Sequence, residues 1–142
     1  MVSLLMRSII RHFPNVFLLL NGLVYLFLAY LFLTNATEWF IRLGISPSQE
    51  VGFTELRAMY LGLMFAIGVF VIISSRLETF QLPGLLFLLI SYALLGLVRG
   101  YGIFVEGASN QLMLNLFMAE LSSAILAILA LICSIKNSSG HR

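Results

Sequence analysis

Four long apolar stretches alternate with short polar segments along the 142-residue chain. Each stretch is close to the roughly 20 residues that a helix needs to cross a bilayer, and only helices satisfy the backbone in lipid without forming a closed barrel. The pattern predicts a single domain, residues 1–142, with transmembrane spans at about residues 15–35, 54–75, 81–99 and 111–135. The predicted fold class is all-α, an integral membrane four-helix bundle.

The first apolar stretch permits a second interpretation, a cleaved signal peptide. Arg7 and Arg11 precede it, and the small residue Ala36 follows it. Its apolar region covers about 18 residues, whereas that of a cleaved signal covers roughly 7 to 15. We therefore expect this helix to remain as a membrane anchor.

The segment between the first two spans has the composition of a short interfacial helix. Residues 37–44, with the sequence TEWFIRLG, mix aromatic and aliphatic side chains with Glu38 and Arg42. Trp39 is typical of the aromatic belt at the membrane surface. Ser46, Pro47 and Ser48 then predict a turn before the second span.

Composition excludes a soluble domain. Hydrophobic residues make up 61% of the chain, charged residues make up 10%, and no Asp occurs. A soluble protein of this size would have too little polar surface to meet water. Cys133 is the one cysteine, so no internal disulfide can form, and we expect it to be a buried packing thiol.

The positive charges predict the orientation. Five of the eight Lys and Arg residues fall on the side of the two termini: Arg7, Arg11, Arg76, Lys136 and Arg142. The other side has at most three, namely Arg42, Arg57 and Arg99. The excess of positive charge predicts that both termini lie in the cytoplasm.

Glu120 is the candidate functional residue, because it lies inside the apolar stretch 111–135. Nine residues beyond Gln111, it is about 14 Å along the helix, near the middle of the hydrocarbon core. A carboxyl group there costs a few kcal/mol, so we expect it to face protein or trapped water. It serves either as a structural clasp with an arginine or as a group that binds a ligand or handles a proton.

Other charged residues can reach the same half of the membrane. Glu55 and Arg57 open the second span and Arg99 closes the third, so all three lie toward the exoplasmic side together with Glu120. We expect Arg57 or Arg99 to pair with Glu55 or Glu120, although each residue near a boundary can instead extend to water. Small residues in the second span predict its packing face: Ala58, Gly62 and Ala66.

Recognisable catalytic and cofactor motifs are missing from the sequence. His12 and His141 lie near opposite ends of the chain, which excludes a bis-histidine haem site or a His-based zinc site. There is no Ser, His and Asp set and no Gly-rich phosphate loop. We therefore predict no cofactor, no metal, no nucleic-acid partner and no enzymatic activity.

The second span carries a motif, Glu55-Leu56-Arg57-Ala58-Met59-Tyr60-Leu61-Gly62-Leu63. It resembles the hallmark Glu-Leu-Arg-Ala-x-Tyr-Gly-Gly-Leu of a bacterial family of small four-helix membrane proteins of unknown function. Further matches are Arg99, Glu106-Gly107 where the family has Asp-Gly, and Glu120. Leu61 departs from the hallmark by replacing its first Gly.

This resemblance implies a shared polar set, comprising Glu55, Arg57, Tyr60, Arg99 and Glu120, but no established activity. A more distant likeness to DoxX-like four-helix proteins, some associated with quinone-linked oxidoreductases, is architectural.

Three classes of function remain. The first is a non-enzymatic scaffold or accessory subunit, which associates with copies of itself or with other proteins. The second is a membrane-embedded binding or transport protein for a lipid, a quinone or a proton-coupled solute. The third, an enzyme acting on lipids, ranks last because no pair of nucleophile and base is evident.

Overall fold

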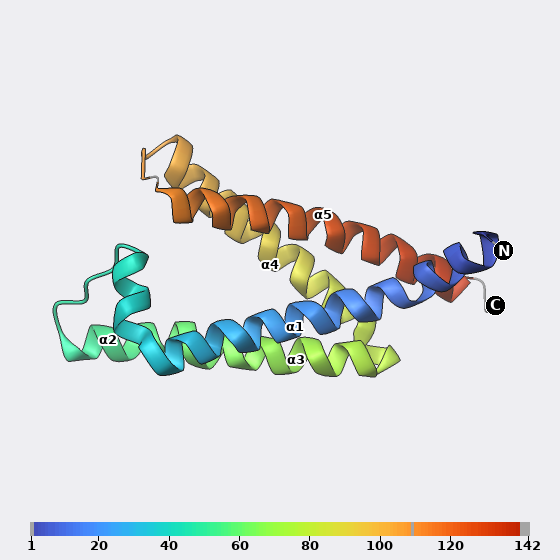
Figure 1. The fold of residues 1–142 in the computed structure, drawn as a ribbon, viewed down its shortest axis with the longest axis horizontal. Coiled ribbons are helices and arrows are strands. Elements are labelled where there is room, and N and C mark those ends of the chain that lie inside the picture. Colours follow the sequence, from blue (N-terminus) through green and yellow to red (C-terminus); the bar gives the residue numbers. More distant parts are fainter. Residues whose placement is uncertain (1, 109, 140–142) are drawn as a thin grey trace. The chain divides into compact units, whose positions relative to one another are not determined.

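The computed structural model describes residues 2–108 and 110–139, and the side chains of residues 10–108 and 110–137. All regular secondary structure in these residues is helical (Figure 1). The elements are α1 (Val2–Arg42), α2 (Glu50–Arg57), η1 (Ala58–Leu63), α3 (Met64–Arg76), α4 (Glu78–Phe104) and α5 (Gln111–Ser139). The described residues contain four helical segments long and apolar enough to cross a membrane: Ile10–Arg42, Glu50–Arg76, Glu78–Phe104 and Gln111–Asn137. The predicted all-α class with four spans is confirmed.

The chain groups into two compact units. Unit 1 comprises the described parts of Met1–Leu18 and Ser74–Arg142, and unit 2 comprises Leu19–Ile73. That the whole chain forms a single domain stays a prediction.

The observed helices extend beyond the predicted spans because their ends are polar. The second span begins at Glu50 rather than at residue 54. Gln49, in an extended conformation, precedes it, and the carboxylate of Glu50 in the first turn complements the helix dipole. Similarly, α4 begins at Glu78 rather than at residue 81 and continues to Phe104. A hydropathy pattern detects the apolar centre of each helix, whereas charged and polar turns complete its ends.

In unit 2, the first helix changes direction at Asn35. This residue has non-helical angles of φ −140° and ψ 45°, and a short helical segment of seven residues follows it, ending at Arg42. The predicted short helix between the first two spans is thus present, and its position in the membrane interface stays a prediction. Ala36 and Phe40 of this segment, together with Phe32 before the kink, are buried against aromatic and aliphatic side chains, including those of Phe53 and Tyr60.

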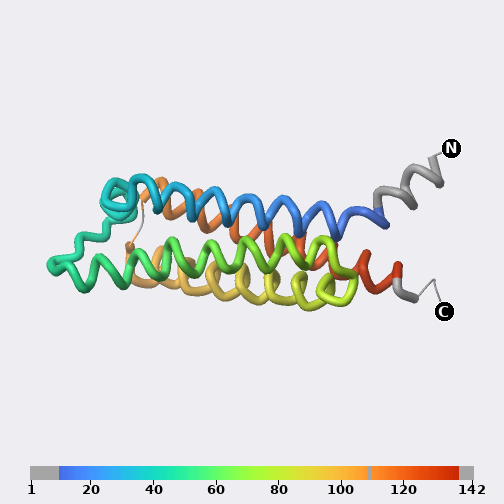
Figure 2. Tube along the Cα trace, turned by 90° about the horizontal axis from the view of Figure 1, so that it is seen from below, coloured from blue at the N-terminus to red at the C-terminus, as the bar shows by residue number. Residues whose placement is uncertain are grey.

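The two long helices of unit 2 run side by side (Figure 2), and their backbones approach closely at a pair of glycines. A Cβ on Gly22 would lie 3.0 Å from the carbonyl oxygen of Gly68, and a Cβ on Gly68 would lie 3.0 Å from that of Gly22. Ala58, Gly62 and Ala66, predicted as the packing face, are instead exposed. That prediction was wrong, because Gly68 and Gly22 together let the backbones meet where no side chain intervenes.

The second span is not a regular α-helix throughout. Its residues Ala58–Leu63 form η1, a π-helical turn, between α2 and α3. Such turns are rare and contain one more residue per turn than the α-helix around them. This one falls on the second half of the motif that begins at Glu55.

Unit 1 is built on the antiparallel hairpin of α4 and α5 (Figure 1). Gly84 near the start of α4 lies against Ser74 at the end of α3, where a Cβ would come within 2.5 Å of the Ser74 Cβ. Leu85, Leu88, Ala127 and Ala130 are fully buried along the unit. This hairpin positions the candidate site.

Candidate functional site

The turn between α4 and α5 sets the register of the hairpin. Gly107 has a φ of +70°, a left-handed conformation that a residue with a side chain adopts only with strain. Asn110 directly precedes α5, and its Oδ1 accepts a hydrogen bond from the backbone N–H of Met113 at 2.8 Å. This is the geometry of an Asn N-cap. Together they fix where α5 begins relative to α4.

The helix directions bring Arg99 and Glu120 toward each other. Arg99 lies five residues before the end of α4, about 8 Å along its axis, and Glu120 lies about 14 Å into α5. Side chains on a helix lean toward its N-terminus. Because the two helices are antiparallel, the guanidinium leans deeper into the hairpin and the carboxylate leans toward the turn. The two side chains lean toward each other and thereby bridge the difference in depth between the Arg99 and Glu120 backbones.

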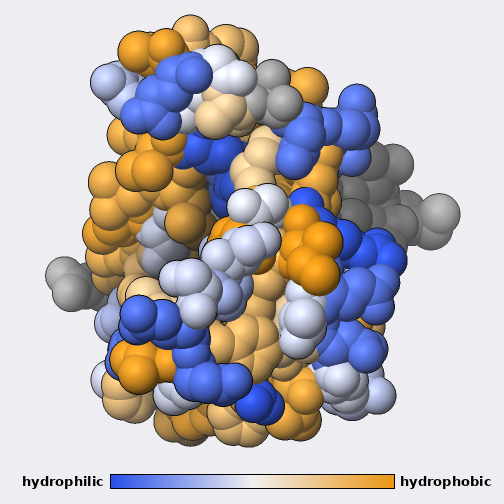
Figure 3. Space-filling model, turned by 90° about the vertical axis from the view of Figure 1, so that its left-hand side faces the viewer, coloured by the Kyte–Doolittle hydropathy of each residue, from blue (hydrophilic) through white to orange (hydrophobic). Residues whose placement is uncertain are grey.

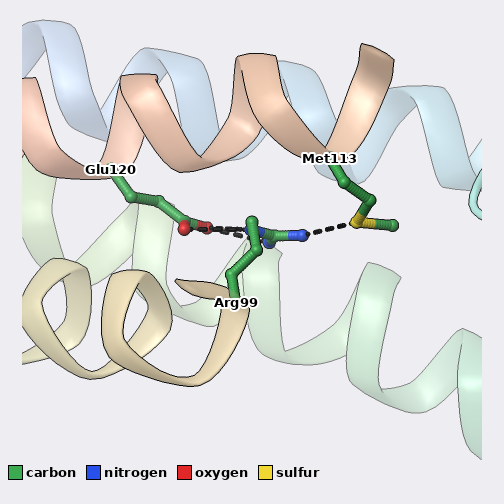
Figure 4. Close-up of polar contacts among 3 residues, drawn as sticks. All are labelled: Arg99, Met113 and Glu120. Carbon is green, nitrogen blue, oxygen red and sulfur yellow. Dashed lines mark hydrogen bonds and ion pairs between the residues drawn. The ribbon is translucent and has the colours of Figure 1, made fainter. Parts of the chain in front are cut away.

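The resulting ion pair is bidentate (Figure 4). Arg99 Nη2 donates to Glu120 Oε1 at 2.8 Å, and Arg99 Nε donates to Oε2 at 2.9 Å and to Oε1 at 3.1 Å. Such a fork matches the planar guanidinium to both carboxylate oxygens and is the strongest geometry for this kind of pair. The expected pairing of an arginine with Glu120 is therefore present, and Arg99 is the partner.

Met113 occupies the remaining side of the guanidinium. Arg99 Nη1 points at the Sδ atom of Met113, 3.1 Å away, on the side opposite Glu120 (Figure 4). A thioether sulfur is only a weak acceptor. The arginine thus meets a strong acceptor on one edge and a weak one on the other.

The pair is largely shielded from solvent. Glu120 is 7% exposed, and the side chain of Arg99 is 22% exposed. Gly100, next to Arg99, permits the close approach of the helices, because a Cβ there would lie 3.0 Å from the ring of Phe117. Packing of small and aromatic residues around the pair therefore reduces its contact with water.

The other predicted site residues belong to unit 2. Glu55 and Arg57 are exposed, and Arg57 lies over the ring of Phe53 with its Cζ 5.8 Å from the centroid. Tyr60 is half-buried, and its ring lies 4.8 Å from that of Phe32 and 5.5 Å from that of Phe40. The structure thus brings Arg99 and Glu120 together within unit 1. That all five residues form one cluster stays a prediction.

A second polar network in unit 1 was not predicted from the sequence. Gln81 on α4 donates a hydrogen bond to Asn15 on α1 and accepts one from Ser134 on α5 at 2.7 Å. Ser134 lies 14 residues beyond Glu120, about 21 Å along α5. Each residue lies at the edge of an apolar stretch and therefore resembled a boundary residue. The amide of Gln81 links three helices far from the ion pair.

The two ends of the described chain meet near this network. Asn137 Nδ2 donates to the backbone oxygens of Ile10 and Arg11, each at 3.5 Å. Residues 10–11 of α1 and Asn137 of α5 thus lie at the same end of unit 1. The side chain of Arg7 and residues His141 and Arg142 lie outside the described residues.

The described residues contain one free thiol, that of Cys133, and no cluster of metal-binding side chains. Within residues 2–108 and 110–139, no three His, Cys, Asp or Glu side chains gather as a metal site would require. Cys133 is free and half-buried, so it is less enclosed than the predicted packing thiol.

The four apolar helices define a small multi-pass membrane protein. The family model described as a domain of unknown function (DUF4345) matches residues 13–131, and the chain belongs to this family. Searches of curated proteins and of solved structures found no match. The family match covers most of the chain, whereas the second-span hallmark and the likeness to DoxX-like proteins stay predictions.

Proposed function

We propose that the chain is a non-enzymatic scaffold or accessory subunit of the bacterial inner membrane, in which the Arg99–Glu120 pair clasps α4 to α5. The bidentate geometry of the pair supports this role, since one guanidinium engages both oxygens of the carboxylate. A buried pair of this kind adds little net stability compared with apolar residues. It does penalise every alternative register in which either charge loses its partner.

The clasp can be tested with Glu120→Gln. The amide keeps some hydrogen-bonding capacity but leaves the guanidinium of Arg99 without a counter-charge, at a cost of about 3 kcal/mol. We expect a lower unfolding temperature than wild type in detergent, by the same amount with and without added membrane lipid extract. Glu106→Gln, an exposed residue in the α4–α5 turn, is the matched control and should change little.

A second candidate function is membrane-embedded binding or transport of a lipid, a quinone or a proton-coupled solute. The contact of Arg99 Nη1 with Met113 Sδ favours it, because a ligand oxygen is a better acceptor than a thioether. In the same experiment, this function predicts that lipid extract raises the unfolding temperature of wild type. Glu120→Gln would then remove that protection while barely changing stability in detergent alone. This pattern would overturn the clasp.

The proposed orientation places both termini in the cytoplasm and Ser48 on the exoplasmic side. In a background with Cys133→Ala, cysteines introduced at Ser3 or Ser139 should resist an impermeant thiol reagent in intact cells. A cysteine at Ser48, which is exposed in the loop between α1 and α2, should react. Labelling of both terminal positions without Ser48 would invert the orientation.

A further inference from the structure

A hollow in unit 2 combines polar and aromatic groups at the end of two predicted membrane spans. Its volume is about 520 Å³, and it lies where the chain passes from α1 to α2. The loop faces the viewer in Figure 3, where hydrophilic surface borders hydrophobic surface. Its lining includes Thr37, Phe40, Ser46, Ser48, Glu50 and Phe53. A loop that joins two spans lies in the headgroup layer, so a lipid headgroup is the molecule most abundant around this hollow.

The charge in the hollow selects for a cation. Glu50 is exposed and is the only charged residue among those that line it. Phe40 and Phe53, whose rings meet edge to face with centroids 5.6 Å apart, supply aromatic surface. A carboxylate beside aromatic rings is a suitable environment for an ammonium group. The hydroxyl groups of Thr37, Ser46 and Ser48 add acceptors for N–H donors.

A positive charge lies next to the hollow on the same helix. Arg57 is seven residues after Glu50, two turns further along the second span, so both lie on one helical face. Its guanidinium lies over the ring of Phe53, which lines the hollow. An arginine side chain leans toward the N-terminus of its helix, which here means toward Glu50. The face therefore presents a carboxylate, a ring and a guanidinium in sequence.

We propose that this face of unit 2 binds a zwitterionic phospholipid headgroup of the ethanolamine type, with its ammonium at Glu50 and its phosphate at Arg57. A primary ammonium donates N–H bonds to the carboxylate and hydroxyl groups, whereas the trimethylammonium of choline has no N–H to donate. A glycerol headgroup has the phosphate but no cation. The site thus discriminates among three headgroups that share the same phosphate.

Binding should be measured on the full chain in detergent by native mass spectrometry, with ethanolamine, choline and glycerol phospholipids of identical acyl chains. We expect the ethanolamine lipid to bind about tenfold more tightly than the other two, as the loss of one charge-assisted hydrogen bond implies. Glu50→Gln should abolish this preference. Arg57→Gln should weaken all three lipids alike. Free phosphoethanolamine should compete only weakly if the acyl chains contribute, and competition equal to that of the lipid would assign the site to a soluble ligand.

Glu38→Gln is the matched control. Glu38 is an exposed carboxylate of the same unit that pairs with Arg42 at 2.6 Å and does not line the hollow. Equal binding of the ethanolamine and choline lipids to wild type would overturn the proposal, as would a loss of preference in Glu38→Gln as large as that in Glu50→Gln. Ser48→Ala, which keeps both charges, provides a second variant and should reduce the preference for ethanolamine over choline.

Discussion

Replacing Glu120 with Leu should destabilise the protein by about 3 kcal/mol or more, because the guanidinium of Arg99 would stay buried without its counter-charge. The paired replacement of Arg99→Met and Glu120→Leu should recover most of that loss. Removing both charges leaves apolar side chains of similar size between α4 and α5, which is often neutral for stability. Denaturant unfolding in detergent of wild type, both single variants and the double variant measures the coupling between the two residues.

The outcome of this double-mutant cycle shows whether Arg99 and Glu120 act as a pair or as two independent charges. A double variant as unstable as the sum of the singles would show that Arg99 and Glu120 do not act as a pair. A double variant that folds well but assembles into several oligomeric states would instead support a role in specifying one arrangement of the helices.

Gly22→Ala should have the second large effect. Its Cβ would lie 2.6 Å from the Cγ1 atom of Ile72 and 3.0 Å from the backbone oxygen of Gly68, so the two helices of unit 2 would have to separate. Overpacking of this kind costs about 1–3 kcal/mol. The unfolding temperature in detergent should therefore fall.

Gly62→Ala is the matched control within the same unit. A Cβ on Gly62 would have no neighbour within 4 Å, and Ala reduces the freedom of the unfolded chain. We expect this variant to equal wild type or to gain up to about 1 kcal/mol. If Gly62→Ala were as damaging as Gly22→Ala, the close approach of the helices would not be the cause.

The sequence was sufficient to predict the helices and the pairing of an arginine, Arg57 or Arg99, with Glu55 or Glu120, but not which residues pair. In an apolar stretch long enough to cross a membrane, the helix satisfies the hydrogen bonds of the backbone within the segment itself. A carboxylate such as Glu120 within one of them requires a partner, and Arg99 in the preceding span was one of few charges within reach. Both arguments need only the chain itself.

Contacts between two helices could not be predicted from the sequence, because they depend on which helices pair and in which register. Gly22 and Gly68 are 46 positions apart, and spacing within one helix shows only the exposed series of Ala58, Gly62 and Ala66. Met113 resembled any apolar packing residue until its Sδ atom was found at the guanidinium. Asn15, Gln81 and Ser134 resembled membrane boundaries until the structure linked them.

The π-helical turn Ala58–Leu63 has a consequence for how the second span divides its surface. One additional residue in a turn rotates everything after it by about 100° relative to an uninterrupted α-helix. In a regular α-helix, Gly68, eleven residues after Arg57, would lie on nearly the same face as Arg57, and the additional residue moves it to a different side. The turn thus acts as a rotational offset. The polar face of the first turns can therefore face one environment while Gly68 faces α1. A regular α-helix with the same sequence would direct both toward the same neighbour.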